Sequence, residues 1–66
     1  MANGSAYDFG AAIARLTCIL EDATVLAAEG QSRHIDYSTR LRLVADLEKA
    51  IVQASLVLKE IRTKSE

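Results

Sequence analysis

The sequence contains no proline and no tryptophan, and its one cysteine is Cys18. A single cysteine excludes an internal disulfide, and the only histidine, His34, is too far along the chain to form a metal-ligand pattern with Cys18. A chain of 66 residues without disulfides or a metal usually depends on another chain, because its core is too small to offset the entropy lost on folding. We therefore expect no metal, no cofactor and an oligomeric protein. One unpaired thiol also favours a reducing, cytoplasmic location.

Aromatic residues are scarce too, although half of the residues are hydrophobic. The core is therefore expected to be aliphatic and rich in alanine, as in closely packed helices. A net charge of −1 gives no overall attraction to nucleic acid or to anionic membranes. The first five residues lack the features of a signal peptide, and charges at Arg15 and Glu21 argue against a membrane-spanning segment.

The segment from about residue 37 to 63 has the pattern of a long helix. Read in sevens, its apolar residues fall into three adjacent columns, which is typical of a helix packed in a bundle. The first column is Tyr37, Val44, Ile51 and Leu58, and the second is Leu43, Ala50 and Val57. The third is Arg40, Leu47, Ala54 and Ile61, in which Arg40 is the one charged residue. The opposite column, which we expect to face solvent, is Thr39, Asp46, Gln53 and Glu60. Asp36 or Ser38 is expected to cap the start of the helix.

The segment from about residue 6 to 29 is predicted to be a second helix, with Ser5 as its cap and Asp8 three positions later. Its one polar stripe is Asp8, Arg15, Asp22 and Glu29. Nearly all other positions are apolar, including Cys18, which we expect to be a core residue. A helix this apolar around its circumference is buried on more than one side. Because one partner helix covers only part of such a surface, this helix favours an oligomer.

Residues 30–36 are expected to form a short loop, with Gly30 ending the first helix in a left-handed conformation. Two helices joined in this way form an antiparallel hairpin, in which the numbers of facing residues add up to about 66. This register places Arg15 near Ile51, and Glu29 near Arg40. The predicted fold is a single-domain, all-α antiparallel helical hairpin that dimerises into a four-helix bundle, with a higher oligomer as the alternative. The candidate oligomer interface is Ile13, Leu16, Ile19, Leu20, Val52 and Leu56.

No catalytic pattern is present in the sequence. Cys18 lies in the middle of a predicted helix and His34 lies in the loop, so the hairpin cannot bring the thiol and the imidazole together. There is also no glycine-rich phosphate-binding loop. We therefore expect a protein that is not an enzyme.

The one local concentration of positive charge lies at the hairpin tip. It consists of Arg33, His34, Arg40 and Arg42. Guanidinium groups at the start of a helix suit an anion, a nucleotide or an RNA backbone. The alternative is structural, because Glu29 and Asp46 are near enough in the sequence to form ion pairs with Arg40 and Arg42.

Three functions remain open at this level. The first is a small regulator or inhibitor that binds another protein through the surface of its bundle. The second is a protein that binds RNA, a nucleotide or another anion through the arginine-rich tip. The third is a structural adaptor subunit whose apolar first helix is covered by neighbours in a larger assembly.

Overall fold

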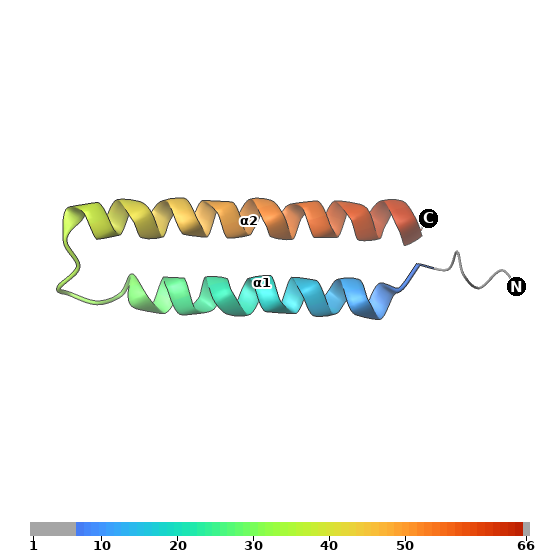
Figure 1. The fold of residues 1–66 in the computed structure, drawn as a ribbon, viewed down its shortest axis with the longest axis horizontal. Helices are drawn as coiled ribbons and strands as arrows, with labels where there is room; N and C mark the ends of the chain where they lie inside the picture. The colour runs from blue at the N-terminus through green and yellow to red at the C-terminus, as the bar shows by residue number, and fades with distance from the viewer. Residues whose placement is uncertain (1–6, 66) are drawn as a thin grey trace, which may run out of the picture.

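The computed structural model of the chain describes residues 7–65 and consists of two long helices. Helix α1 runs from Phe9 to Glu29 and helix α2 from Tyr37 to Ser65. They lie side by side and run in opposite directions, so the expected antiparallel helical hairpin is confirmed (Figure 1). Neither helix, over the residues described, contains a stretch long and apolar enough to cross a membrane.

Asp8 sets the beginning of α1. Its backbone is extended, with φ −89° and ψ 90°, and its carboxylate accepts the backbone N–H of Ala11 at 2.9 Å. A side-chain acceptor at this position satisfies one of the N–H groups that have no partner within the helix. The helix therefore begins at Phe9 rather than near residue 6, and Asp8 is its cap rather than part of its polar stripe. The expected cap, Ser5, lies outside the described residues.

The end of α1 differs from the expectation for Gly30. This residue has φ −67° and ψ −13°, which is right-handed rather than left-handed. The chain continues in a tighter turn, in which Gln31 N–H bonds to the Ala28 carbonyl at 3.1 Å and Ser32 N–H to that of Glu29 at 3.2 Å. Such short-range bonds satisfy the last free carbonyls of a helix without a left-handed residue.

Asp36 caps α2, which is one of the two caps predicted from the sequence, Asp36 or Ser38. Its carboxylate accepts the backbone N–H of Thr39 at 2.8 Å and the hydroxyl of Ser38 at 3.3 Å. The hydrogen bond from the Thr39 backbone lowers the pKa of Asp36 most, and the positive charge of Arg42 lowers the pKa further.

The connection between the helices shifts their register. It runs outward along the long axis before it turns, so α2 begins beyond the end of α1 (Figure 1). Arg15 consequently forms an ion pair with Glu60, and their numbers add up to 75 rather than to about 66. The predicted position of Arg15 near Ile51 is therefore wrong. In residues 7–65 the Arg15–Glu60 pair is the only ion pair, so the expected pair between Glu29 and Arg40 is also not formed.

Few side chains are buried between the helices. The buried set is Ala12, Leu43, Ala50 and Val57. Half-buried apolar residues continue the contact: Leu16, Ile19, Ala23 and Leu26 from α1, with Leu47, Ala54 and Ile61 from α2. The alanines at the centre leave room for the two helices to approach closely. Helix α1 thus covers one side of the broad apolar stripe of α2 and leaves the other side open.

Two expectations about burial are corrected by this packing. The column expected to face solvent lies at the edge of the contact, because Thr39, Asp46 and Glu60 are half-buried and only Gln53 is exposed. Cys18, expected in a core, is exposed. It lies outside the packed contact, in an open groove that is also lined by Leu56 of α2.

Candidate functional site

One long side of the hairpin, the apolar face, consists of a column from each helix: Ile13, Leu20 and Ala27 of α1, and Val44, Ile51 and Leu58 of α2. Members of each column are seven residues apart and therefore lie on the same side of their helix. A groove of about 420 Å³ is lined by Ala27 and Val44 together, so the two columns belong to the same side of the hairpin.

The apolar face is open to solvent at its centre. Leu20 is 52% exposed and Ile51 is 62% exposed. Val44 and Leu58 are also largely exposed, although both are aliphatic. Complete burial of such a side chain is worth about 1.5–3 kcal/mol relative to full exposure, and these half-exposed residues forgo part of that stabilisation. A contiguous row of exposed aliphatic side chains is typical of surfaces that bind another molecule.

Two threonines form the α1 edge of this face. The hydroxyl of Thr17 donates to the Ile13 carbonyl at 3.0 Å, and that of Thr24 donates to the Leu20 carbonyl at 2.8 Å. Both hydroxyls therefore have a partner in their own helix and need no water. This edge can be covered without leaving a hydroxyl unsatisfied, because only the methyl groups remain to be packed.

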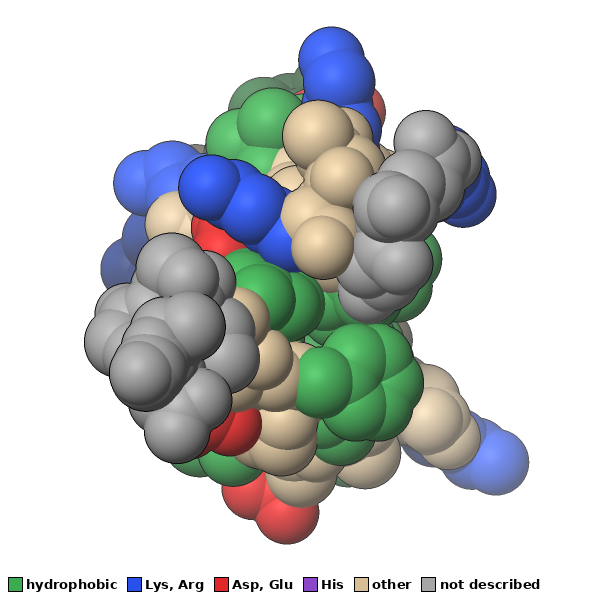
Figure 2. Space-filling view, turned by 90° about the vertical axis from the view of Figure 1, so that its right-hand side faces the viewer, with side chains coloured by type: hydrophobic (Ala, Val, Ile, Leu, Met, Phe, Trp, Pro, Cys, Tyr) green, Lys and Arg blue, Asp and Glu red, His purple; other side chains and the backbone are tan. Residues whose placement is uncertain are grey.

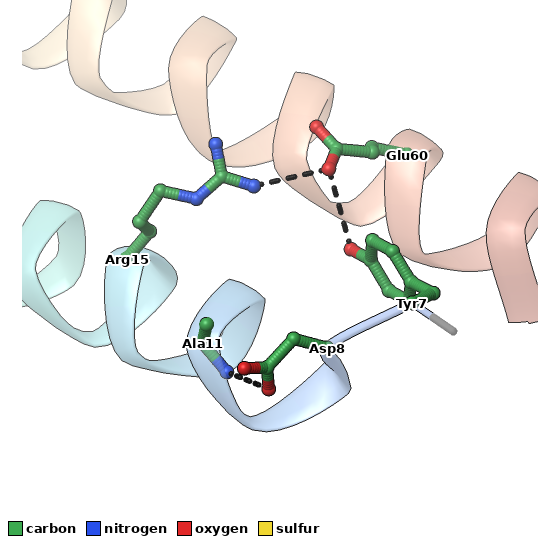
Figure 3. Close-up of polar contacts among 5 residues, drawn as sticks. All are labelled: Tyr7, Asp8, Ala11, Arg15 and Glu60. Atoms are coloured by element: carbon green, nitrogen blue, oxygen red, sulfur yellow. Dashed lines mark hydrogen bonds and ion pairs between the residues drawn. The ribbon is translucent and has the colours of Figure 1, made fainter. Parts of the chain in front are cut away.

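The opposite side, the ion-pair face, carries polar contacts between the chain ends (Figure 3). One oxygen of Glu60 accepts from the Arg15 guanidinium at 3.1 Å and from the Tyr7 hydroxyl at 3.4 Å. Partial burial raises the pKa of Tyr7 most, and the negative charge of Glu60 raises it further. Next to these contacts lies a second groove of about 430 Å³, lined in part by Cys18 and Leu56.

The distribution of charge differs between the helices. Between Phe9 and Glu29, α1 carries three acidic residues and one arginine, so its net charge is −2. Between Tyr37 and Ser65, α2 carries six basic and three acidic residues, so its net charge is +3. Viewed from the end that holds both termini, basic side chains gather around α2, the upper helix (Figure 2).

The predicted cationic patch is not brought together at one point. All four residues, Arg33, His34, Arg40 and Arg42, are exposed. Arg40 lines the groove at the loop end of the apolar face, whereas Arg42, two residues later, lies on another side of α2. The charge of Arg42 acts on Asp36 instead. His34 donates its backbone N–H to the Ser32 hydroxyl at 3.3 Å, and its imidazole is exposed.

The residues predicted for the oligomer interface divide into three groups. Ile13 and Leu20 lie on the apolar face. Leu16 and Ile19 are half-buried on the side of α1 that packs against α2. Val52 and Leu56 are exposed on α2 away from the apolar face, and Leu56 lines the groove of the ion-pair face.

The apolar-face residues of α2, namely Val44, Ile51 and Leu58, were expected in the stripe that packs inside the hairpin. The signal that could have placed them outside is the width of that stripe. Three adjacent columns are more than one neighbouring helix covers, so one column had to remain open.

Within residues 7–65 there is no group of three or more histidine, cysteine or acidic side chains placed to hold a metal ion. No family model matches the chain, and comparison with curated proteins and with solved structures found no match either. The function is therefore argued from the two faces of the hairpin.

Proposed function

We propose that this chain is a small, non-enzymatic interaction protein, a regulator or inhibitor that binds another protein and works as an oligomer. The supporting observation is the amount of apolar surface that the hairpin leaves open. Eleven large hydrophobic side chains are exposed in the described part of the chain, and they lie on both helices.

The total surface supports the same proposal. The chain exposes 5244 Å², whereas a compact monomer of 7.2 kDa is expected to expose about 4,100 Å². The excess of roughly 1,100 Å² is similar to the area that one partner contributes to a specific protein–protein interface, about 800 Å². Covering this surface would supply stabilisation that four buried side chains do not.

The proposed partner is a protein rather than RNA, because both helices expose large aliphatic side chains and Arg40 and Arg42 lie on different sides of α2. The two exposed faces differ in composition. The apolar face suits a helical surface of the same kind, whereas the ion-pair face combines an open groove with Arg15 and Glu60 at its edge. A chain that assembles through one face keeps the other available for its target.

The test is a quantitative pull-down of the tagged, full-length chain from its native cell, read by mass spectrometry. We expect one protein to be enriched in stoichiometric amounts, and to be lost when a lysine replaces Leu56 in the groove of the ion-pair face. The matched control is Val25→Lys, since Val25 is 57% exposed and Leu56 is 60% exposed. If the wild-type chain enriches no protein other than itself, the proposed function is wrong.

A further inference from the structure

The apolar face has the size that a dimer of this chain requires. The helices lie side by side over the 21 residues of α1, which is about 32 Å at 1.5 Å per residue. Two helices of about 10 Å diameter make a strip about 20 Å wide. The strip is therefore roughly 600 Å² before side-chain relief is added, which approaches the 800 Å² that each partner contributes to a standard interface.

Its chemistry suits a second copy of the same surface. Each helix contributes three apolar positions at intervals of seven, with Leu20 and Ile51 in the middle of their columns. Columns at this spacing pack into one another in left-handed bundles. The central positions carry no charge, and the hydroxyls of Thr17 and Thr24 are already bonded to their own helix. The central parts of two such faces can meet without burying an unpaired charge or an unsatisfied hydroxyl, and Arg40 and Arg62 lie towards the ends.

The net charges of the helices favour one orientation of the second copy. Two-fold symmetry allows two face-to-face arrangements. If the loops lie at opposite ends, α2 packs on the partner's α2. If the loops lie at the same end, α2 of each copy packs on the partner's α1. Because α2 has a net charge of +3 and α1 of −2, only the second arrangement gives every helix neighbours of opposite charge.

Individual arginines favour the same arrangement. Arg40 and Arg62 lie eleven residues before and after Ile51, and both are exposed close to the Val44–Leu58 column. With the loops at opposite ends and Ile51 at the centre, Arg40 would face Arg62 of the partner subunit, and the reverse. With the loops at the same end, Arg40 lies opposite the partner's connecting loop and Arg62 opposite the first turns of the partner's α1, so the approach of Arg40 to Arg62 is avoided.

We propose that the apolar face is covered by a second copy of this chain, related by a two-fold axis parallel to the helices, with both loops at one end. The inference rests on the proposed function, because it names the partner that covers one of the two faces. In this dimer the ion-pair face of each copy points outward.

The mass of the protein in solution tests which face is used. By light scattering at micromolar concentration, the wild-type chain is expected at twice 7.2 kDa. Ile51→Lys should weaken association at least a hundredfold, because it places a charge in the middle of the apolar face. Leu56→Lys is the matched control, since Leu56 is exposed to almost the same extent on the same helix, and it should leave the mass unchanged. A folded wild-type monomer, or dissociation by Leu56→Lys alone, would overturn the proposal.

The orientation is tested on a chain that keeps the apolar face intact, so the result does not depend on a variant that fails to fold. A spin label is attached to Ser32→Cys at the hairpin tip in a Cys18→Ser background. With the loops at the same end, the two labels lie across the width of the bundle, about 20–30 Å apart. With the loops at opposite ends, they are separated by at least the length of α2, about 43 Å for 29 residues. A distance in the longer range would refute the proposed axis.

Failure of this inference and failure of the proposed function have different signatures. A folded monomer that still enriches a protein partner rejects the dimer and retains the interaction function. A dimer with the predicted label distance that enriches nothing else retains the dimer and rejects the function.

Discussion

The two faces of the hairpin are formed by the same two helices but differ in the contacts that their side chains make. On the apolar face, aliphatic side chains stand in water at intervals of seven and make no polar contact. On the ion-pair face, Glu60 joins Arg15 and Tyr7, and the contact ties the chain ends together. The difference shows that polar contacts join the helices on one side of the hairpin, whereas aliphatic side chains on the other side stay exposed in the single chain.

That difference also separates what stabilises one chain from what stabilises an assembly. The side chains buried between α1 and α2 should contribute to stability at every protein concentration. The side chains of the apolar face should contribute to stability only where a partner covers them. The following substitutions test this separation, in order of decreasing effect.

The contact within the hairpin should give the largest loss. Leu43 is 6% exposed, so Leu43→Ala is expected to lower the free energy of unfolding by about 2–5 kcal/mol, because it removes buried methyl groups and leaves a cavity. Leu41→Ala removes the same atoms from an exposed position on the same helix and should change it by less than about 0.5 kcal/mol. Denaturant titration of both variants measures the difference. Equal losses would mean that α1 packs on another side of α2.

The apolar face should give an intermediate loss that depends on protein concentration. Ile51→Ala is expected to lower the stability of the dimer by about 2 kcal/mol per chain, through lost apolar burial. Leu56→Ala should have little effect, since Leu56 stays in solvent in the dimer. Thermal melts over a hundredfold concentration range test this, because the melting temperature of an obligate dimer rises with concentration. A concentration-independent wild-type melt would contradict it.

The ion-pair face should give a small loss that salt removes. Glu60→Gln weakens the contact with Arg15, in which both side chains are about half exposed, and is expected to lower the free energy of unfolding by about 0.2–1 kcal/mol. Gln53→Ala, an exposed position one heptad away, serves as the control. At about 1 M salt the Debye length falls to about 3 Å, so the two variants should become alike. A difference that persists at high salt would assign the role of Glu60 to packing.

The cap of α2 should give the smallest effect, seen only at low pH. The pKa of Asp36 is lowered in the folded state, so its contribution to stability is present above the ordinary aspartate pKa of about 3.9. This contribution is lost as the pH falls through the lower, folded pKa. Helix content followed by circular dichroism should therefore fall less steeply below pH 4 in Asp36→Asn, since asparagine still caps but does not titrate. Identical acid profiles would show that other carboxyl groups dominate.

The helices could be predicted from the sequence because their signals are local. The seven-residue columns, the absence of proline and the Asp36 cap each depend on neighbouring residues, and they placed α2 at nearly its observed bounds. The start of α1 was missed by three residues, because Asp8 is as good a cap as Ser5 and periodicity does not choose between two caps.

The register, and which of the apolar columns of α2 stays open, could not be predicted because both depend on the path of the loop. The right-handed conformation of Gly30 and the tight turn after it carry the chain outward before it reverses, which moves Glu60 next to Arg15. Column patterns define which side of a helix is apolar, but they do not define how far one helix slides along another. The broad apolar stripe of α2 could pack against α1 through either of its sides. The three columns alone gave no reason to prefer the side that contains Leu43.

The exposed thiol of Cys18 has a consequence for how the protein behaves in an oxidising solution. Each chain has one cysteine, so oxidation can join chains only in pairs. In the proposed dimer the two thiols point away from each other, and each can bond to a different neighbouring dimer. Mild oxidation should then build linear polymers of dimers. Each disulfide in such a polymer joins two chains, and no chain forms more than one disulfide. A denaturing, non-reducing gel would show only monomers and covalent pairs, while the native particles continue to grow, and a reductant would return them to their original size.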